Sequence, residues 1–244
     1  MAKKQFIPTF IKEERKPAPT NHYDAPIPIT SNHKLMHNIL KDWSKKVVLI
    51  TGFAGTGKSI CSCYYAAQAL KEDKVNGIII IRSLCGIGKD PGALPGDVLA
   101  KNLPKVSQFL KYISAFTGID TTTLIQNDMV TIEGLHDIQG QDWSNKYVIV
   151  TESQTLGPSE MYILVSRGAE KIVFDGDTLN RGQASNKAVK YGRDGLSFLL
   201  DVLKGLPFVA SVKLSNIDDI VRKDYIRDII LRITPKLDEW LDSK

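Results

Sequence analysis

An apolar segment followed by a glycine-rich loop constrains the fold of this chain more than any other feature. Residues 47–50 are Val-Val-Leu-Ile, which suits a buried strand, and residues 52–59 read Gly-Phe-Ala-Gly-Thr-Gly-Lys-Ser. This loop matches the complete pattern G-x-x-x-x-G-K-[ST]. Residues 60–70 carry three alanines and a leucine, and can form the helix that should follow. Strand, loop and helix in this order predict a phosphate-binding site.

The residue types of the loop suit a nucleoside triphosphate. Glycines let the backbone turn so that several N–H groups face one anion, and the start of the next helix adds its positive dipole end. Lys58 can reach the β- and γ-phosphates, and the hydroxyl of Ser59 can ligate Mg²⁺. The alternative is a glycine-rich turn that binds nothing. The residues expected to contact the nucleotide are Gly52, Phe53, Ala54, Gly55, Thr56, Gly57, Lys58, Ser59 and Ile60.

Apolar segments alternate with helical ones along most of the chain. This alternation predicts an α/β fold, with a mostly parallel sheet that has helices on both faces. The segments expected to be strands are residues 47–51, 78–81, 129–132, 147–151, 171–174 and 208–214. The main helices are expected at residues 33–43, 60–70, 104–116, 158–167, 194–203 and 217–233, with a short helix capped by Asp97. In such a sheet the ligand binds at the carboxyl ends of the strands.

The chain divides into a core and two flanking segments. Residues 1–30 contain five prolines and predict an extended or disordered arm. Residues 31–233 hold the alternating elements and are expected to form one P-loop NTPase core, followed by a tail at 234–244.

Charge and hydropathy narrow the choice of partners. The net charge of +5 permits a nucleic acid as a partner, although the chain has no helix-turn-helix or zinc-site pattern. No apolar run approaches the roughly 18 residues of a membrane span, so no membrane partner is expected. The three cysteines give no disulfide framework, and we expect a cytoplasmic protein.

Acidic residues follow two of the expected strands. Thr151-Glu152 comes after the strand at 147–151, where a P-loop enzyme usually has Asp-Glu; the first carboxylate holds Mg²⁺ and the second orients water. Glu152 alone could polarise water. Asp175 and Asp177 follow the strand at 171–174, and we hypothesise that one of them supplies the metal ligand that Thr151 lacks. The alternatives are a solvated glutamate and a plain turn with two hydrated carboxylates.

Phosphoryl transfer also needs cations where charge develops in the transition state. The candidates are Arg167 at the end of the helix at 158–167, Arg222 in the sequence Asp-Asp-Ile-Val-Arg, and Arg82 in a glycine-rich loop. Each has an alternative role in a surface salt bridge.

Taken together, these motifs resemble the PhoH-like family of P-loop ATPases, which is related to the nucleotide-binding half of superfamily 1 helicases. The likeness is carried by the phosphate loop, by Leu94-Pro95-Gly96-Asp97, by Gly176-Asp177 and by Asp219-Ile220-Val221-Arg222. It implies a RecA-like fold, ATP and Mg²⁺ as cofactors, ATP hydrolysis, and coupling to RNA or single-stranded DNA.

The chain departs from the family pattern at two places that bear on function. The family's Asp-Glu-Ala-Gln is similar to Thr151-Glu152-Ser153-Gln154, so the metal-holding aspartate is missing. The upstream glutamine expected to contact adenine falls at His33, after Asn32, and both are therefore candidates for base contact. Such divergence in a lone core would fit a bacteriophage version of the family.

A single core of this kind also predicts self-association. By resemblance, a second core normally closes the site, so we expect an arginine from a neighbouring subunit, Arg222 or Arg167, in a homo-oligomer such as a hexamer. Two other functions remain open: a nucleotide-binding switch or scaffold with little turnover, which Thr151 favours, and a nucleoside or small-molecule kinase.

Overall fold

The protein contains one parallel six-stranded sheet in the order β3-β2-β4-β5-β1-β6. The computed structural model describes residues 23–82, 98–135, 138, 140–177 and 194–242. The strands are β1 (Val47–Gly52), β2 (Gly77–Arg82), β3 (Val130–Glu133), β4 (Lys146–Thr151), β5 (Lys171–Gly176) and β6 (Val209–Leu214). All six expected strands are present, which confirms the predicted α/β fold.

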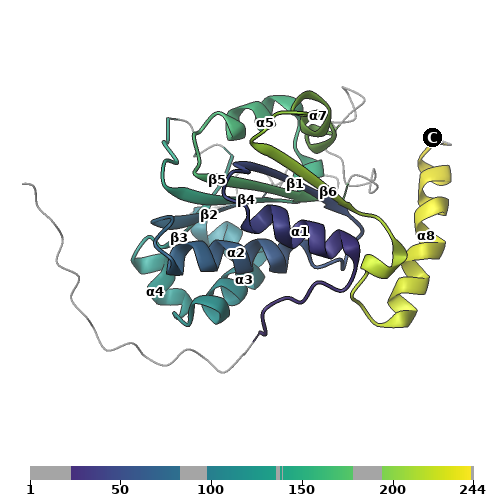
Figure 1. The fold of residues 1–244 in the computed structure, drawn as a ribbon, viewed down its shortest axis with the longest axis horizontal. Helices are drawn as coiled ribbons and strands as arrows, with labels where there is room; N and C mark the ends of the chain where they lie inside the picture. The colour runs from purple at the N-terminus through teal and green to yellow at the C-terminus, as the bar shows by residue number, and fades with distance from the viewer. Residues whose placement is uncertain (1–22, 83–97, 136–137, 139, 178–193, 243–244) are drawn as a thin grey trace, which may run out of the picture.

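Helices cover both faces of the sheet (Figure 1). They are α1 (Ser31–Lys41), α2 (Lys58–Lys71), α3 (Val98–Thr117), α4 (Thr121–Gln126), α5 (Pro158–Val165), α7 (Gly195–Val202) and α8 (Asp224–Asp242). In β4, Tyr147 and Ile149 belong to the core beneath α1, α2 and α3, while Val148 and Val150 belong to the core beneath α5 and α7. Continuous apolar strands therefore fill two separate cores.

The strand register brings the carboxyl ends of five strands to one edge of the sheet. Thr151 of β4 pairs with Arg82 of β2, while Asp175 of β5 pairs with Ile50 of β1. On the other side, Gly52 of β1 pairs with Leu214 of β6. The phosphate loop leaves β1 at this edge, which is where a parallel α/β sheet binds its ligands.

Lys171, the first residue of β5, fixes one end of α1 to the sheet. Its side chain is fully buried, and its ammonium group donates to the main-chain oxygens of Ile39, Leu40 and Asp42 at 3.0, 2.7 and 2.8 Å. The last carbonyls of a helix have no partner within the helix, so a buried cation satisfies them. Burial lowers the pKa of Lys171 to about 8, and the group therefore remains largely charged at neutral pH.

Three helical segments differ from the sequence-based expectation. Residues 98–117 form one helix, α3, rather than two, and α4 was not predicted. The helix expected at residues 217–233 is instead a short 3-10 helix, η3 (Ile217–Asp219), followed by α8. Because α8 continues to Asp242, it includes most of the segment that we expected to be a tail.

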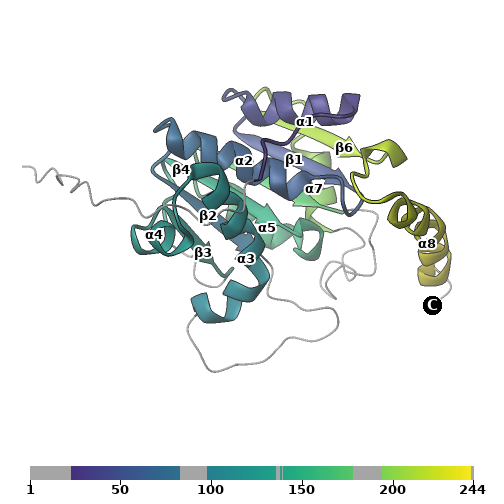
Figure 2. The same cartoon turned by 90° about the horizontal axis from the view of Figure 1, so that it is seen from below.

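Helix α8 extends away from the sheet on the β6 side of the molecule (Figures 1 and 2). Tyr225, Ile229 and Ile233 are about half exposed along it, at 59%, 47% and 55%. None of the helices in the described ranges combines the length and apolar composition needed to cross a bilayer. Most of the segment expected to be an arm (residues 1–22), the Leu94–Asp97 motif and residues 178–193 lie outside the described residues.

Candidate nucleotide-binding site

The phosphate loop joins β1 to α2 through two glycines in the left-handed region. Gly55 has φ 83° and Gly57, which directly precedes α2, has φ 80°. A Cβ atom at Gly55 would lie 2.6 Å from Cγ of Arg222, so a larger residue would displace that side chain and would also be strained at this positive φ. The sequence therefore folds this loop into the tight turn that presents the start of a helix to an anion.

Lys58 is folded back over the loop. Its Nζ donates to the main-chain oxygens of Gly52 and Phe53 at 2.7 and 2.8 Å. Burial lowers the pKa of Lys58, and the charges of Asp175, Asp177 and Glu152 act in the opposite direction. A triphosphate would offer this ammonium group stronger, charged acceptors than two carbonyl oxygens.

Asp175 provides a buried carboxylate beside the loop. It is 2% exposed, and its Oδ1 accepts a hydrogen bond from Oγ1 of Thr151 at 2.8 Å. Burial raises the pKa of Asp175, and Glu152 raises it further, while the hydrogen bond from Thr151, the charge of Lys58 and a hydrogen bond from Ser59 lower it. The threonine at the end of β4 thus contacts the carboxylate on the neighbouring strand.

The other oxygen of this carboxylate fits a metal ion. Oδ2 of Asp175 is buried and has no hydrogen-bond partner, which is costly unless a ligand satisfies it. Ser59 contacts the same side chain, so the two residues form the pair that could hold Mg²⁺. In the described part of the chain, no group of three or more histidine, cysteine, aspartate or glutamate side chains is arranged for a metal. Mg²⁺ commonly uses only one or two carboxylates.

Asp177, the other predicted metal ligand, lies close by but is held differently. Its main-chain N–H donates to Oε1 of Gln154 at 3.1 Å, and its charge raises the pKa of Lys58. Gln154 also donates to Oε2 of Glu152 at 2.8 Å. One glutamine side chain therefore connects the ends of β4 and β5, a role that sequence reasoning missed.

Glu152 directly follows β4 in a strained conformation. Its φ is 55°, a left-handed value that costs a non-glycine residue about 1 kcal/mol. Its Oε1 lies 4.0 Å from Nη2 of Arg82, and both side chains are partly exposed. Strained residues of this kind cluster at functional sites. The Glu152 side chain is 41% exposed and close enough to Asp175 to raise its pKa, so a water molecule can reach Glu152 beside the loop.

Asn32 and His33 lie in the first turn of α1, and their side chains contact the protein rather than open space. Nδ2 of Asn32 donates to Oδ2 of Asp219 at 2.9 Å. Nε2 of His33 lies 3.2 Å from the main-chain oxygen of Thr56, and Nδ1 of His33 lies 3.3 Å from the N–H of Thr30. Both ring nitrogens of His33 thus have partners within the protein, and the contact with adenine that the resemblance implies for Asn32 and His33 stays a prediction.

Two of the three candidate arginines, Arg222 and Arg167, lie at opposite ends of the strands. Arg222 lies against Gly55 of its own chain, so it reaches the loop without a neighbouring subunit. Arg167 follows α5, and its main-chain oxygen accepts from the N–H of Trp143, just before β4 begins. That is the amino end of the strands. Arg167 is therefore remote from the phosphate loop of its own chain, and its expected role, as an arginine supplied by a neighbouring subunit, stays a prediction.

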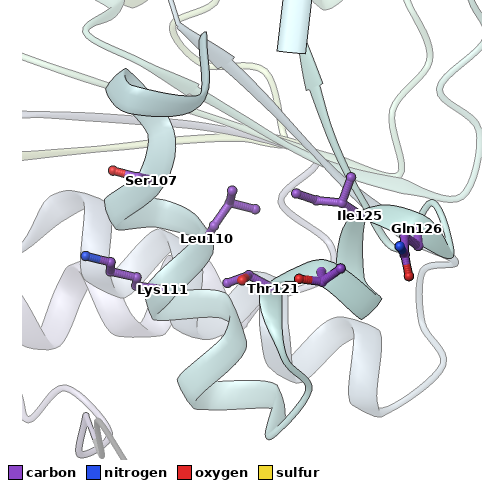
Figure 3. A pocket seen from close by; sticks show the side chains of 7 residues that line it. Ser107, Leu110, Lys111, Thr121, Ile125 and Gln126 are labelled. Carbon is purple, nitrogen blue, oxygen red and sulfur yellow. The ribbon is translucent and has the colours of Figure 1, made fainter. Parts of the chain in front are cut away.

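A separate open pocket of about 470 Å³ lies between α3 and α4 (Figure 3). Its lining is mostly apolar and includes Leu110, Ile125 and one cation, Lys111. Since α4 precedes the amino end of β3, the pocket is remote from the phosphate loop. The nucleotide site is thus defined by the loop and the strand ends rather than by this pocket.

A parallel sheet that presents a G-x-x-x-x-G-K-[ST] loop beside a buried carboxylate defines the class of P-loop NTPase folds. Comparison with known proteins narrows this class. A family model described as "PhoH-like protein" matches residues 27–234. The chain therefore belongs to the PhoH-like protein family.

Several curated proteins are similar to this chain. A PhoH-like protein of Bacillus subtilis (strain 168) is 28% identical over 181 residues, covering 73% of this chain and 55% of that protein. Protein PhoH2 of Mycolicibacterium smegmatis is 25% identical over 214 residues, covering 84% and 47%. The chain thus spans about half the length of the curated relatives it matches. Among solved structures, unliganded Pif1 from Bacteroides sp. aligns at 18% identity and a TM-score of 0.36, covering 81% of this chain and 43% of that one.

Proposed function

We propose that the chain binds ATP with Mg²⁺ and hydrolyses it. The observation that carries the proposal is the buried Asp175 carboxylate, which contacts Ser59 and Thr151 and leaves Oδ2 unpaired beside the phosphate loop. Ser59 and Asp175 would hold the metal ion, which when bound neutralises charge on the β- and γ-phosphate oxygens. The carboxylate that the family has on one strand would thus be supplied from the neighbouring strand.

Three other side chains have assigned tasks in this proposal. Lys58 moves its ammonium group from the loop carbonyls to the phosphates. Glu152 orients the attacking water and accepts its proton. Arg222, next to Gly55, stabilises the charge that develops on the transferred phosphoryl group.

The proposed working form is a homo-oligomer that acts on or near RNA or single-stranded DNA. Helix α8 supports the first part, because Tyr225, Ile229 and Ile233 follow a four-residue spacing and share one exposed stripe. The net charge of +5 is compatible with the second part. In a hexamer, α8 would pack against a neighbouring copy.

A switch or scaffold with little turnover is the second candidate, and one observation favours it. Glu152 is already held by Gln154 and approached by Arg82, which reduces its freedom to act on water. Such a protein would bind ATP tightly and release phosphate slowly.

A phosphate-release assay separates these functions. The chain is incubated with ATP and Mg²⁺ alone, with RNA, or with single-stranded DNA, beside a control that follows labelled phosphate onto added nucleosides. The proposal predicts Mg²⁺-dependent release that nucleic acid stimulates. Tight binding without release supports the switch, and transfer to an acceptor would contradict both.

A further inference from the structure

Two consecutive carbonyl groups of the phosphate loop are held by segments outside the loop. The main-chain oxygen of Gly55 accepts a hydrogen bond from the N–H of Val221 at 2.9 Å. The main-chain oxygen of Thr56 lies 3.2 Å from Nε2 of His33, which is 4% exposed. Val221 follows η3 and His33 lies in α1, so segments far apart in the sequence meet on the loop.

These two contacts set the direction of the N–H groups that follow. A trans peptide is planar, and its C=O and N–H bonds point in opposite directions. Holding the oxygen of Gly55 therefore orients the N–H of Thr56, and holding the oxygen of Thr56 orients the N–H of Gly57. Glycine permits a peptide to turn over at little cost, so the loop needs such contacts to keep its donors facing one anion.

The hydrogen bonds of His33 also fix its tautomer. The N–H of Thr30 points at Nδ1, which must therefore carry a lone pair, and the ring proton is on Nε2. Nε2–H then donates to the oxygen of Thr56. Thr30 and His33 together cap the start of α1, because the main-chain N–H of His33 also donates to Oγ1 of Thr30 at 3.1 Å. One nitrogen of His33 thus serves the helix and the other serves the loop.

The two supports are joined to each other through a buried aspartate. Asp219 is fully buried, and it accepts from Oγ1 of Thr30 at 2.6 Å and from Nδ2 of Asn32 at 2.9 Å. It lies two residues before Val221, so the start of α1 and the segment after η3 hold the loop as one unit.

We infer that His33 is a positioning residue, which sets the affinity of the loop for the triphosphate group rather than for the base. The inference rests on the proposed function in that the loop must bind a triphosphate. It does not require hydrolysis. A residue that contacts adenine affects ATP alone, whereas a residue that orients loop N–H groups affects every ligand carrying the triphosphate.

Two substitutions separate the two nitrogens of His33. His33→Asn places a polar atom where Nδ1 was and keeps the contact with Thr30, but it is too short to reach Thr56. His33→Gln places an amide N–H where Nε2 was and keeps the donor to Thr56. The matched control is His37→Ala, one turn further along α1. Nδ1 of His37 contacts the hydroxyl of Tyr65 rather than a carbonyl group of the loop.

Calorimetry then measures the dissociation constants of Mg·ATP, Mg·GTP and Mg·tripolyphosphate for each variant. We expect His33→Asn to weaken all three by a similar factor of about three to ten, as the loss of one hydrogen bond implies. His33→Gln and His37→Ala should remain within about twofold of the wild type. Thermal unfolding without ligand checks that each variant is folded.

Three results would overturn the inference. They are a loss confined to ATP, an unchanged affinity of His33→Asn for all three ligands, and a loss for His33→Gln as large as that for His33→Asn. A wild-type protein that binds none of the ligands would instead refute the proposed function, and the inference with it. A wild-type protein that binds without hydrolysing leaves the comparison among variants fully decisive.

Discussion

Glu152 carries the proton transfer in this account, and its role can be separated from binding. Glu152→Gln keeps the hydrogen-bonding shape but removes the base, so we expect kcat for ATP to fall at least about 100-fold. KM should change by no more than about threefold, because the residue is not expected to bind the phosphates. Steady-state phosphate release measures both constants.

The control for this variant is Glu72→Gln. Glu72 is an exposed glutamate that pairs with Lys74 away from the loop. The Glu72→Gln variant should leave kcat and KM for ATP unchanged. An equal kcat for Glu152→Gln and the wild type would remove Glu152 from the mechanism.

Asp175 shows how a functional charge opposes stability. Because burial raises its pKa, the ionised carboxylate is destabilising in the ligand-free fold. With a raised pKa, the native state binds more protons than the unfolded state. The contribution of Asp175 to the free energy of unfolding therefore declines as the pH rises above the ordinary pKa of an aspartate. We predict that Asp175→Asn raises the free energy of unfolding of the ligand-free protein by about 1 kcal/mol at pH 7.

Urea unfolding without nucleotide or Mg²⁺ measures this effect. The advantage of Asp175→Asn over the wild type should shrink as the pH is lowered, since the wild-type carboxylate then becomes neutral. A variant that is less stable than the wild type at pH 7 would show that the buried charge is already compensated in the free protein.

Single residues of the site could be predicted only where the signal is local. The phosphate loop follows from its own pattern, and Asp175 follows from its place after an apolar strand. The contacts of His33 and Gln154 could not be predicted, because they join segments that meet only after folding. The hydrogen bond from Thr30 to Asp219 likewise depends on a contact across 189 positions.

Secondary-structure elements, too, could be predicted only where the signal is local in the sequence. The strands are continuous apolar runs, so their positions and their burial on both faces could be predicted. Helix α3 continues past Pro104, where a break was expected, because Val106, Phe109, Leu110 and Ile113 bury its apolar face against the core. Helix α4 was missed because it begins with three threonines, which are poor helix formers; its cap at Asp120 was the available signal.

Helix α1 depends on Lys171 for its attachment to the sheet. Lys171→Met leaves the main-chain oxygens of Ile39 and Leu40 without this donor, whereas that of Asp42 keeps the N–H of Lys45. We expect the substitution to lower the free energy of unfolding by about 2–4 kcal/mol. Chemical denaturation at pH 7 measures this loss. Lys74→Met is the matched control, since the ammonium groups of Lys171 and Lys74 both lie over the ring of Trp43, but Lys74 is 44% exposed. Equal effects would mean that the carbonyl contacts contribute little.

At the scale of the whole molecule, the proposal of a homo-oligomer rests on α8 and its exposed stripe of Tyr225, Ile229 and Ile233. Charged residues on its exposed stripe should prevent close packing between copies, so Ile229→Glu combined with Ile233→Glu is predicted to convert the oligomer to a monomer. Light scattering coupled to size exclusion measures the mass. The control is Arg232→Glu, which adds the same charge at an exposed position of the same helix. A wild-type monomer would contradict the oligomeric proposal.

The central claim is that a carboxylate on β5 replaces the missing one on β4 as the metal ligand. Titration calorimetry of ATP with and without Mg²⁺, for the wild type and for Asp175→Asn, tests it most directly. We expect Mg²⁺ to increase the ATP affinity of the wild type at least about tenfold and to have little effect on that of Asp175→Asn. An equal gain from Mg²⁺ in both proteins would contradict it.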